Sequence, residues 1–257
     1  MTTYKLTLEY DGTRYRGWQA QKNTGRTVAA ARERAASEVC EEPVRVHGAG
    51  RTDAGVHALA QVAHFQARAV LSSPEVQYGI NDRLPPDINV LAAEHVPDGF
   101  HARHDAVSRT YVYRISKRRT AFEKPFVWWV KDRLDVEPMR AAASLFAGKH
   151  DFSSFCENPE GQTSTLVVVE SCALTETEEK ILVRVRASHF LWKMIRRLVG
   201  TLVEVGRGNL AVEDVRKFLE TRSSRPARWT APPSGLFLES VEYAPARPAP
   251  KSRRPGP

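Results

Sequence analysis

A glycine-rich loop contains the residues best suited to chemistry in this chain of 257 residues. It reads Gly-Ala-Gly-Arg-Thr-Asp-Ala-Gly-Val-His over positions 48–57, and glycine lets a backbone bend sharply and approach a ligand closely. It is not a Walker phosphate loop, because Val56 and His57 stand where Lys and Ser/Thr are required. A dinucleotide fingerprint is excluded by the position of its third glycine. The loop therefore presents Arg51 and Asp53 either as a reactive pair or as a turn whose aspartate accepts backbone N–H bonds.

A second candidate is an arginine within an unusually apolar stretch. Positions 190–205 are apolar nearly all round, which predicts a buried helix. Arg196 lies outside the main apolar stripe, with Trp192 and Val199 as its neighbours at helical spacing. A buried guanidinium requires an anion, because the cost of burying an unpaired charge is prohibitive. We therefore expect an anionic partner for Arg196, in a structural salt bridge or in a reactive site, and solvent or a phosphate for Arg197.

Aromatic and basic side chains combine in a third segment. Tyr111 and Tyr113 share one face of a strand predicted over 109–116, and a run of three cations follows at 117–119. Aromatic rings beside cations suit base stacking next to phosphate contacts. The alternative is an ordinary core strand, which we prefer for Tyr113. The segment lacks the RNP1 pattern, which argues against an RRM.

The overall charge favours a polyanionic partner, nucleic acid first. The formal net charge is +8, and part of it comes from Arg247, Lys251, Arg253 and Arg254 in a Pro-rich tail over 244–257 that holds no acid. The body remains basic without this tail. Hydrophobic residues make up 42% and charged residues 26%, which are ordinary values for a globular protein.

Several classes of protein are disfavoured by composition. No stretch approaches the roughly 18 consecutive apolar residues of a membrane span, and the N-terminus carries no signal-peptide core. We therefore expect a cytoplasmic protein with no membrane contact. Three scattered cysteines fit neither a disulfide framework nor a zinc knuckle. His101 and His104 are the only close histidine pair and lack further ligands at metal spacing, so we expect no metal.

The elements that must position these residues occur in the same order twice. Alternation and capping signals predict a strand, a helix, two strands and a helix in the first half, over 4–10, 27–40, 44–47, 61–67 and 74–83. They predict the same order and then a further helix and strand in the second half, over 109–116, 138–147, 166–173, 181–187, 190–205, 212–221 and 236–243. Two β-α-β-β-α units indicate a duplicated α+β fold with a mostly antiparallel sheet. A ligand would bind in the cleft between the halves.

These segments resemble the tRNA pseudouridine synthase A family. Positions 50–58 are similar to its catalytic motif, and further matches follow in order over 10–13, 17–19, 98–103, 109–113, 151–155, 190–205 and 231–236. The resemblance implies the pseudouridine synthase fold, an α+β fold of two duplicated β-α-β-β-α halves with a central active-site cleft. The halves would be residues 1–105, with the catalytic Asp loop, and 106–243, with the Tyr and Arg elements. Residues 244–257 would form a basic, disordered tail.

The resemblance also implies roles for individual residues. Asp53 falls on the catalytic aspartate, Tyr111 on the tyrosine that packs against the target uracil, and Arg196 on the arginine that pairs with the aspartate. Positions that assist base flipping or touch tRNA are Arg51, Phe100, His101, Ala102, Arg103 and His104. The family acts as a homodimer without a cofactor. Its substrates are uridines at about positions 38 to 40 of the tRNA anticodon stem-loop.

Pseudouridine formation suits this residue set. The reaction breaks the N1–C1′ bond, turns the uracil and joins C5 to C1′, so it is an isomerisation that needs one ionised carboxylate. That carboxylate could attack C1′ or the base, or remove the C2′ proton. A glycosidase would need two carboxylates about 5–10 Å apart, and the motif holds no second acid. The remaining alternative is a non-catalytic tRNA-binding or chaperone protein on the same scaffold, and only Asp53 argues against it.

Overall fold

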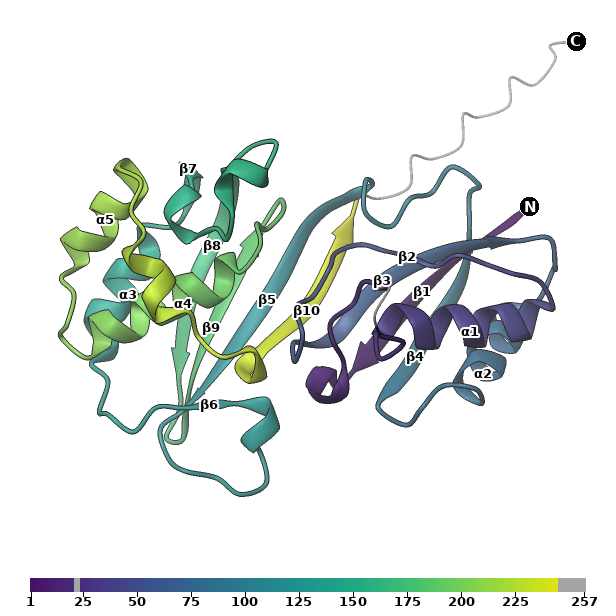
Figure 1. Ribbon diagram of the computed structural model, residues 1–257, viewed down its shortest axis with the longest axis horizontal. Coiled ribbons are helices and arrows are strands. Elements are labelled where there is room, and N and C mark those ends of the chain that lie inside the picture. The colour runs from purple at the N-terminus through teal and green to yellow at the C-terminus, as the bar shows by residue number, and fades with distance from the viewer. Residues whose placement is uncertain (21–23, 245–257) are drawn as a thin grey trace, which may run out of the picture.

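The computed structural model describes residues 1–20 and 24–244 (Figure 1). Its first half holds strands β1 (Thr2–Tyr10), β2 (His47–Gly48), β3 (His57–Ala67) and β4 (Ile88–Val96), with helices α1 (Val28–Cys40) and α2 (Ser73–Asn81). Thr27 caps α1, where its Oγ1 accepts a hydrogen bond from the Ala30 amide at 3.3 Å, as the sequence predicts. The disordered tail predicted over 244–257 lies, except for Ala244, outside the described residues.

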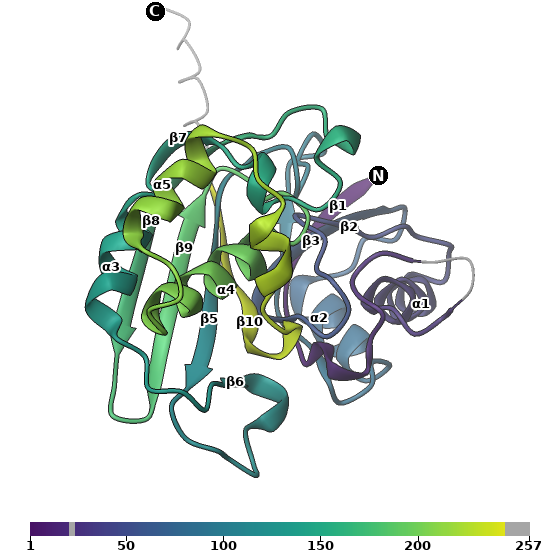
Figure 2. The same ribbon diagram turned by 60° about the vertical axis from the view of Figure 1, so that its left-hand side comes forward.

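The second half repeats the order of the first and adds short elements. Its strands are β5 (Ala106–Ser116), β6 (Trp128–Trp129), β7 (Gly148–Asp151), β8 (Leu166–Glu176), β9 (Lys180–Ala187) and β10 (Leu236–Tyr243). Its helices are α3 (Val136–Ser144), α4 (Met194–Gly206) and α5 (Val212–Glu220). Figures 1 and 2 both show α1 and α2 gathered on one half of the molecule and α3, α4 and α5 on the other.

All ten strands belong to one sheet whose main path runs β4-β1-β3-β10-β5-β9-β8-β7. The first strand of each half lies between two antiparallel neighbours. These are β4 and β3 for β1, and β10 and β9 for β5. The halves meet where β10 pairs in parallel with β3, through Phe237 opposite His57 and Leu238 opposite Ala58. The predicted duplicated α+β fold with a mostly antiparallel sheet is confirmed. This junction brings the loop before β3 close to β5.

Among the differences between the structure and the predicted elements are an additional strand and two predicted segments. Strand β4 was not predicted, because its edge position leaves it without regular alternation of buried and exposed residues. Of the strand predicted over 44–47, only His47 pairs with another strand; it forms β2 together with Gly48. The helix predicted from position 190 begins at Met194, because Lys193 has a left-handed backbone with φ of 60°. A salt bridge of 3.2 Å from Lys193 Nζ to Glu157 holds this turn, which is a long-range contact that local sequence does not reveal.

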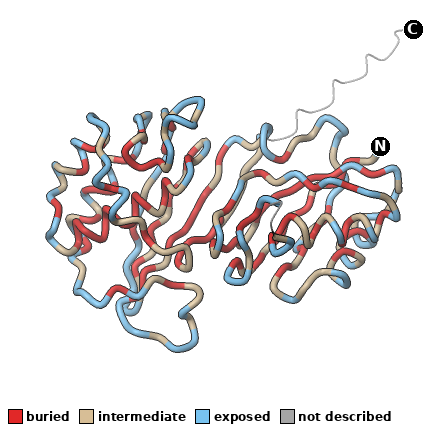
Figure 3. Tube along the Cα trace, viewed as in Figure 1, coloured by how far each residue is buried: buried red, intermediate tan, exposed pale blue. Residues whose placement is uncertain are grey.

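Burial is concentrated along the strands and α4, whereas much of the connecting loops is exposed (Figure 3). Every residue of α4 except Arg196 is buried, as its apolar sequence predicts. Gly200 lets this helix pack directly on the chain that follows α5, since a Cβ there would lie 1.5 Å from the Trp229 carbonyl oxygen. None of the helices formed by residues 1–20 and 24–244 is long and apolar enough to cross a membrane.

Candidate active site

The Asp53 loop, residues 49–56, connects β2 to β3 and is fixed by the end of β1 and the chain that follows it. The Tyr10 hydroxyl lies 2.9 Å from Thr52 Oγ1 in a buried hydrogen bond. The Trp18 amide donates to the Thr52 carbonyl at 3.0 Å. Gly17, with φ of 95°, permits this close approach, because a Cβ at that position would lie 2.8 Å from the same carbonyl. Asp53 is therefore presented by a rigid backbone.

His57, directly after the loop, is a structural residue. Its Nδ1 accepts a hydrogen bond from the Gly12 amide at 3.1 Å and also lies 3.2 Å from Asp11 Oδ1. Its Nε2 lies 3.0 Å from the Pro125 carbonyl oxygen, to which it donates. Burial lowers the pKa of His57, which keeps the imidazole neutral. Both ring nitrogens are thus occupied, and His57 is not available as an acid or base.

Asp53 and Arg196 meet across the junction of the two halves. Arg196 Nη1 lies 3.3 Å from Asp53 Oδ2, although 143 positions separate the residues in sequence. Arg196 Nε donates to the Ala231 carbonyl at 2.7 Å, and the Ala231 amide donates back to the Arg196 carbonyl at 3.0 Å. The side chains of Arg196 and Asp53 are 15% and 26% exposed. The predicted anionic partner of Arg196 is therefore Asp53, in a contact shielded from bulk water yet open on one side.

The neighbouring Arg197 has a different partner. We expected it in solvent or on a phosphate, and this prediction is wrong. Its side chain is buried, forms an ion pair with Glu157 and donates to the Cys156 carbonyl. Successive helical residues point about 100° apart. The left-handed turn at Lys193 sets the start of α4 so that Arg197 faces the interior and Arg196 faces the Asp53 loop.

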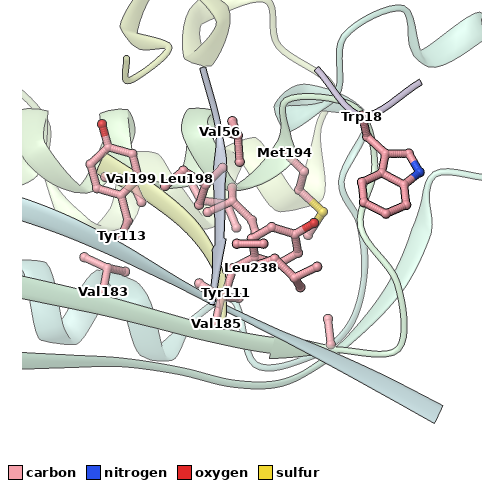
Figure 4. Close-up of a cluster of buried hydrophobic side chains, with 14 of the residues drawn as sticks. Trp18, Val56, Tyr111, Tyr113, Val183, Val185, Met194, Leu198, Val199 and Leu238 are labelled. Atoms are coloured by element: carbon pink, nitrogen blue, oxygen red, sulfur yellow. The ribbon is translucent and has the colours of Figure 1, made fainter. Parts of the chain in front are cut away.

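Tyr111 forms an aromatic wall near the loop. It lies on β5 and is 8% exposed, and its ring meets Phe190 edge-to-face at 5.1 Å between centroids. Its hydroxyl lies 4.0 Å from the point where a Cβ on Gly50 would be. Figure 4 shows the ring among apolar side chains that include Met194. Burial, and the nearby Asp53 charge to a lesser extent, raise the pKa of Tyr111, so the phenol stays neutral.

Arg109, two residues earlier on β5, ties three segments of the site together. Its Nη2 donates to the Ala49 carbonyl at 3.1 Å, at the start of the Asp53 loop, and to the Arg103 carbonyl at 2.7 Å. Its Nη1 donates to the Ser188 carbonyl at 2.8 Å, just after β9. Burial lowers the pKa of this guanidinium. Arg109 is consequently an internal brace that positions the loop.

The residues expected to touch RNA separate into two groups. Arg51, His101, Arg103 and His104 line one pocket beside the Asp53 loop. Phe100 and Ala102 lie behind it, packed with Ala49 and Val62. Ala102 is fully buried, its amide donates to His64 Nδ1 at 3.1 Å, and its carbonyl accepts from the Tyr243 hydroxyl at 2.7 Å. The RNA contact expected at Ala102 is therefore not available to its side chain, because packing and both backbone bonds turn the residue inward.

Four histidine rings form a chain of contacts at this pocket, which three of them line. The ring centroids are 5.2 Å apart for His47 and His64, 4.7 Å for His64 and His101, and 4.2 Å for His101 and His104. Burial, followed by the neighbouring imidazoles, lowers the pKa of His64 to about 4. In the described part of the chain, no three His, Cys, Asp or Glu side chains are grouped so as to hold a metal ion.

Similarity to known proteins extends over almost the whole chain. A family model described as tRNA pseudouridine synthase matches residues 7–105 and 142–244. The chain belongs to the tRNA pseudouridine synthase family. A tRNA pseudouridine synthase A from Rhodopseudomonas palustris (strain BisA53) is 43% identical over 246 residues, which are 95% of this chain and 100% of that protein. A tRNA pseudouridine synthase A 2 from Clostridium perfringens (strain 13 / Type A) is 41% identical with the same coverage.

As a tRNA pseudouridine synthase the protein is an isomerase, as the resemblance implied. Among solved structures, one named "Crystal Structure of a Cbf5-Nop10-Gar1 Complex" matches with a TM-score of 0.36 and 11% identity. That match covers 78% of this chain and 44% of the other.

Sequence reasoning missed two arginines of this synthase. The role of Arg109 as a brace could not be predicted, because two of its carbonyl partners, those of Ala49 and Ser188, lie in segments far away in the sequence. The sequence did contain a signal for Arg32. It lies four residues after Val28 and four before Ala36 in α1, so helical spacing places it on the buried face.

Proposed function

We propose that this synthase isomerises uridines at about positions 38 to 40 of the tRNA anticodon stem-loop, with Asp53 as the catalytic carboxylate. The observation that carries the proposal is the 3.3 Å contact between Arg196 Nη1 and Asp53 Oδ2. A guanidinium at that distance attracts the negative charge of a carboxylate and holds it in place, and a carboxylate so held can act as a nucleophile or base. Since a quarter of the Asp53 side chain is exposed, a nucleotide can reach it.

The remaining groups near Asp53 suit a reaction in which the base leaves and rejoins the ribose. The N1–C1′ bond breaks, the uracil turns, a C5–C1′ bond forms, and C5 loses the proton that N1 gains. During the turn the detached uracil must be retained. Tyr111, a neutral ring braced by Phe190, offers a flat apolar wall against which the uracil stacks.

A paired nucleotide must leave its helix before it reacts. Extrusion costs a few kcal/mol, and cations beside the site offset this cost by holding the flanking backbone. Arg51 is exposed, lies two residues before Asp53 and shares a pocket with Arg103, His101 and His104. We assign base flipping and backbone contacts to these residues.

The proposed assembly is a homodimer, which light scattering of the purified protein tests directly.

The test is tritium release from tRNA labelled at uracil C5. Because C5 gives up its hydrogen when it bonds to C1′, release reports the isomerisation. Wild type releases tritium, whereas Asp53→Asn binds tRNA and releases none. The matched control is Asp132→Asn, which breaks an exposed aspartate–arginine pair with Arg207 (2.7 Å) and keeps wild-type release.

Two other outcomes would change the assignment. Equal release by wild type and Asp53→Asn would remove Asp53 from the chemistry. No release by either, with tight tRNA binding by both, would identify a tRNA-binding protein on a synthase scaffold. The positions are tested with tRNA transcripts in which U38, U39 or U40 is replaced singly, and release that persists without all three would refute that substrate.

A further inference from the structure

A pocket of about 480 Å³ lies beside the Asp53 loop and is separate from the Asp53–Arg196 contact. Its walls come from α1, from residues 45–51 and from the loop after β4. Among the described residues that line it, the charged side chains are Arg32, Arg45, Arg51, Arg103 and a single carboxylate, Glu33. Glu33 accepts a hydrogen bond from the Val46 amide at 3.2 Å. The pocket is therefore strongly electropositive.

Arg32 is the feature that sets this pocket apart. Its side chain is 1% exposed, and Nη2 donates to the Val46 carbonyl at 3.1 Å. Its Cζ lies 3.5 Å from the centroid of the Trp18 ring. Nε and Nη1 are buried with no hydrogen-bond partner, and the charge of the neighbouring Glu33 only partly offsets the effect of burial on this guanidinium. Burial lowers the pKa of this guanidinium to about 9.

Packing alone does not explain a cation at this position. Arg32 shares the buried face of α1 with Val28, Ala35 and Ala36, where an apolar side chain fills space without desolvating a charge. A buried charge without a counter-ion is destabilising. The Trp18 stack holds the guanidinium in a fixed plane, and Gly48 makes room for that ring, since a Cβ there would lie 2.2 Å from Trp18 Cζ2. A preorganised, unpaired cation of this kind is suited to an anion supplied by a ligand.

We propose that this pocket binds a phosphate group of the tRNA backbone, with Arg32 at its floor and Arg45 at its mouth. The identity of the ligand rests on the proposed function, because Gly50 and Arg51 belong both to the pocket wall and to the loop that presents Asp53. A uridine at Asp53 brings the phosphates of its neighbouring nucleotides to this wall. Binding supplies the counter-ion that Arg32 lacks, so the pocket converts a destabilising charge in the free protein into affinity for RNA.

The test compares Arg32→Met with Arg34→Met. Arg34 is exposed on the same helix and does not line the pocket, so both variants lose one charge from α1. Arg32→Met leaves the free protein at least as resistant to urea as wild type, because an unpaired buried charge is removed. It weakens tRNA binding about tenfold and reduces the slope of log Kd against log salt by about 0.7 to 0.9, the value for one phosphate. Arg34→Met keeps the wild-type affinity and slope.

Inorganic phosphate serves as a second probe. It raises the melting temperature of wild type and Arg34→Met and not that of Arg32→Met. Equal tRNA affinity in Arg32→Met and Arg34→Met would overturn the proposal, as would an Arg32→Met protein that loses stability and keeps its affinity. If Arg32→Met does not fold, the test uses Arg45→Met, which changes an exposed residue of the same pocket. If the slope of log Kd against log salt in Arg45→Met equals that of wild type, the phosphate-binding proposal is refuted. Arg32-dependent tRNA binding without tritium release from wild type would refute the proposed function and leave the phosphate pocket standing.

Discussion

Replacing Arg196 with methionine tests whether the contact with Asp53 serves the reaction. Two unit charges 3.3 Å apart interact by about 1.3 kcal/mol in water and by about 5 kcal/mol at an effective dielectric constant of 20. The two side chains are 15% and 26% exposed, so the site lies between these limits. Losing this interaction from the reactive state slows the chemical step by about 10- to 5,000-fold.

The assay is single-turnover tritium release with enzyme in excess over labelled tRNA, together with urea unfolding of the same preparations. Arg196→Met retains the fold, because methionine fills the space of the side-chain stem. Arg196→Lys keeps the charge and loses the 2.7 Å bond from Nε to the Ala231 carbonyl, so its rate falls between those of wild type and Arg196→Met.

The adjacent Arg197 supplies the control. Arg197→Met removes one of the two cations that pair with Glu157, which keeps its 3.2 Å salt bridge to Lys193, and leaves the Cys156 carbonyl without its donor, so it destabilises the fold by about 1–3 kcal/mol. The molecules that remain folded keep the wild-type rate, since Arg197 faces away from Asp53. Our reasoning is refuted if folded Arg196→Met reacts within about threefold of wild type, a change below 1 kcal/mol. It is equally refuted if folded Arg197→Met is as slow as Arg196→Met.

Three further predictions concern the packing, the ring and the pH response. Gly200→Ala lowers the free energy of unfolding, measured in urea, by about 3 kcal/mol, because its Cβ would lie 1.5 Å from the Trp229 carbonyl oxygen. Gly99→Ala is the neutral control, since a Cβ there has no atom within 4 Å. Equal stability of the two variants would contradict the packing argument. Tyr111→Phe keeps most of the single-turnover rate, whereas Tyr111→Ala loses about 5- to 150-fold through lost stacking, and a large loss in Tyr111→Phe would assign the role to the hydroxyl instead. The folded pKa of His64 is about 4, below its ordinary 6.5, so the unfolded chain binds the proton first and stability falls as the pH drops below 6.5. Between pH 7 and pH 5 this group costs about 2 kcal/mol, which urea unfolding detects as a smaller loss in His64→Gln than in wild type; identical pH dependence would disprove the assignment.

Local patterns in the sequence predicted most of the helices and strands, and the family resemblance singled out Asp53. Alternating side chains predicted β1 and β5 because a strand has a period of two, and Thr27 marked the start of α1 because a hydroxyl satisfies free amides there. Three close glycines marked the Asp53 loop as unusual; among them, Gly55 has a left-handed backbone with φ of 77°, and Gly48 leaves room for the Trp18 ring. An arginine in an apolar helix predicted an anion, because an unpaired buried charge is too costly.

Local patterns alone named neither the anion nor the arginine; the resemblance implied the pair of Asp53 and Arg196, and the tertiary structure supplies the physical reason for it. Glu157 holds the turn at Lys193 from a distant loop, and this contact sets the start of α4. Because of where the helix starts, the Arg196 side chain reaches Asp53 and the Arg197 side chain points into the interior. The β3–β10 pairing that brings the two halves together likewise joins strands far apart in the chain. Periodicity reports which side of an element is buried, whereas the partner across the interface depends on how separate elements pack, and local sequence does not contain that information.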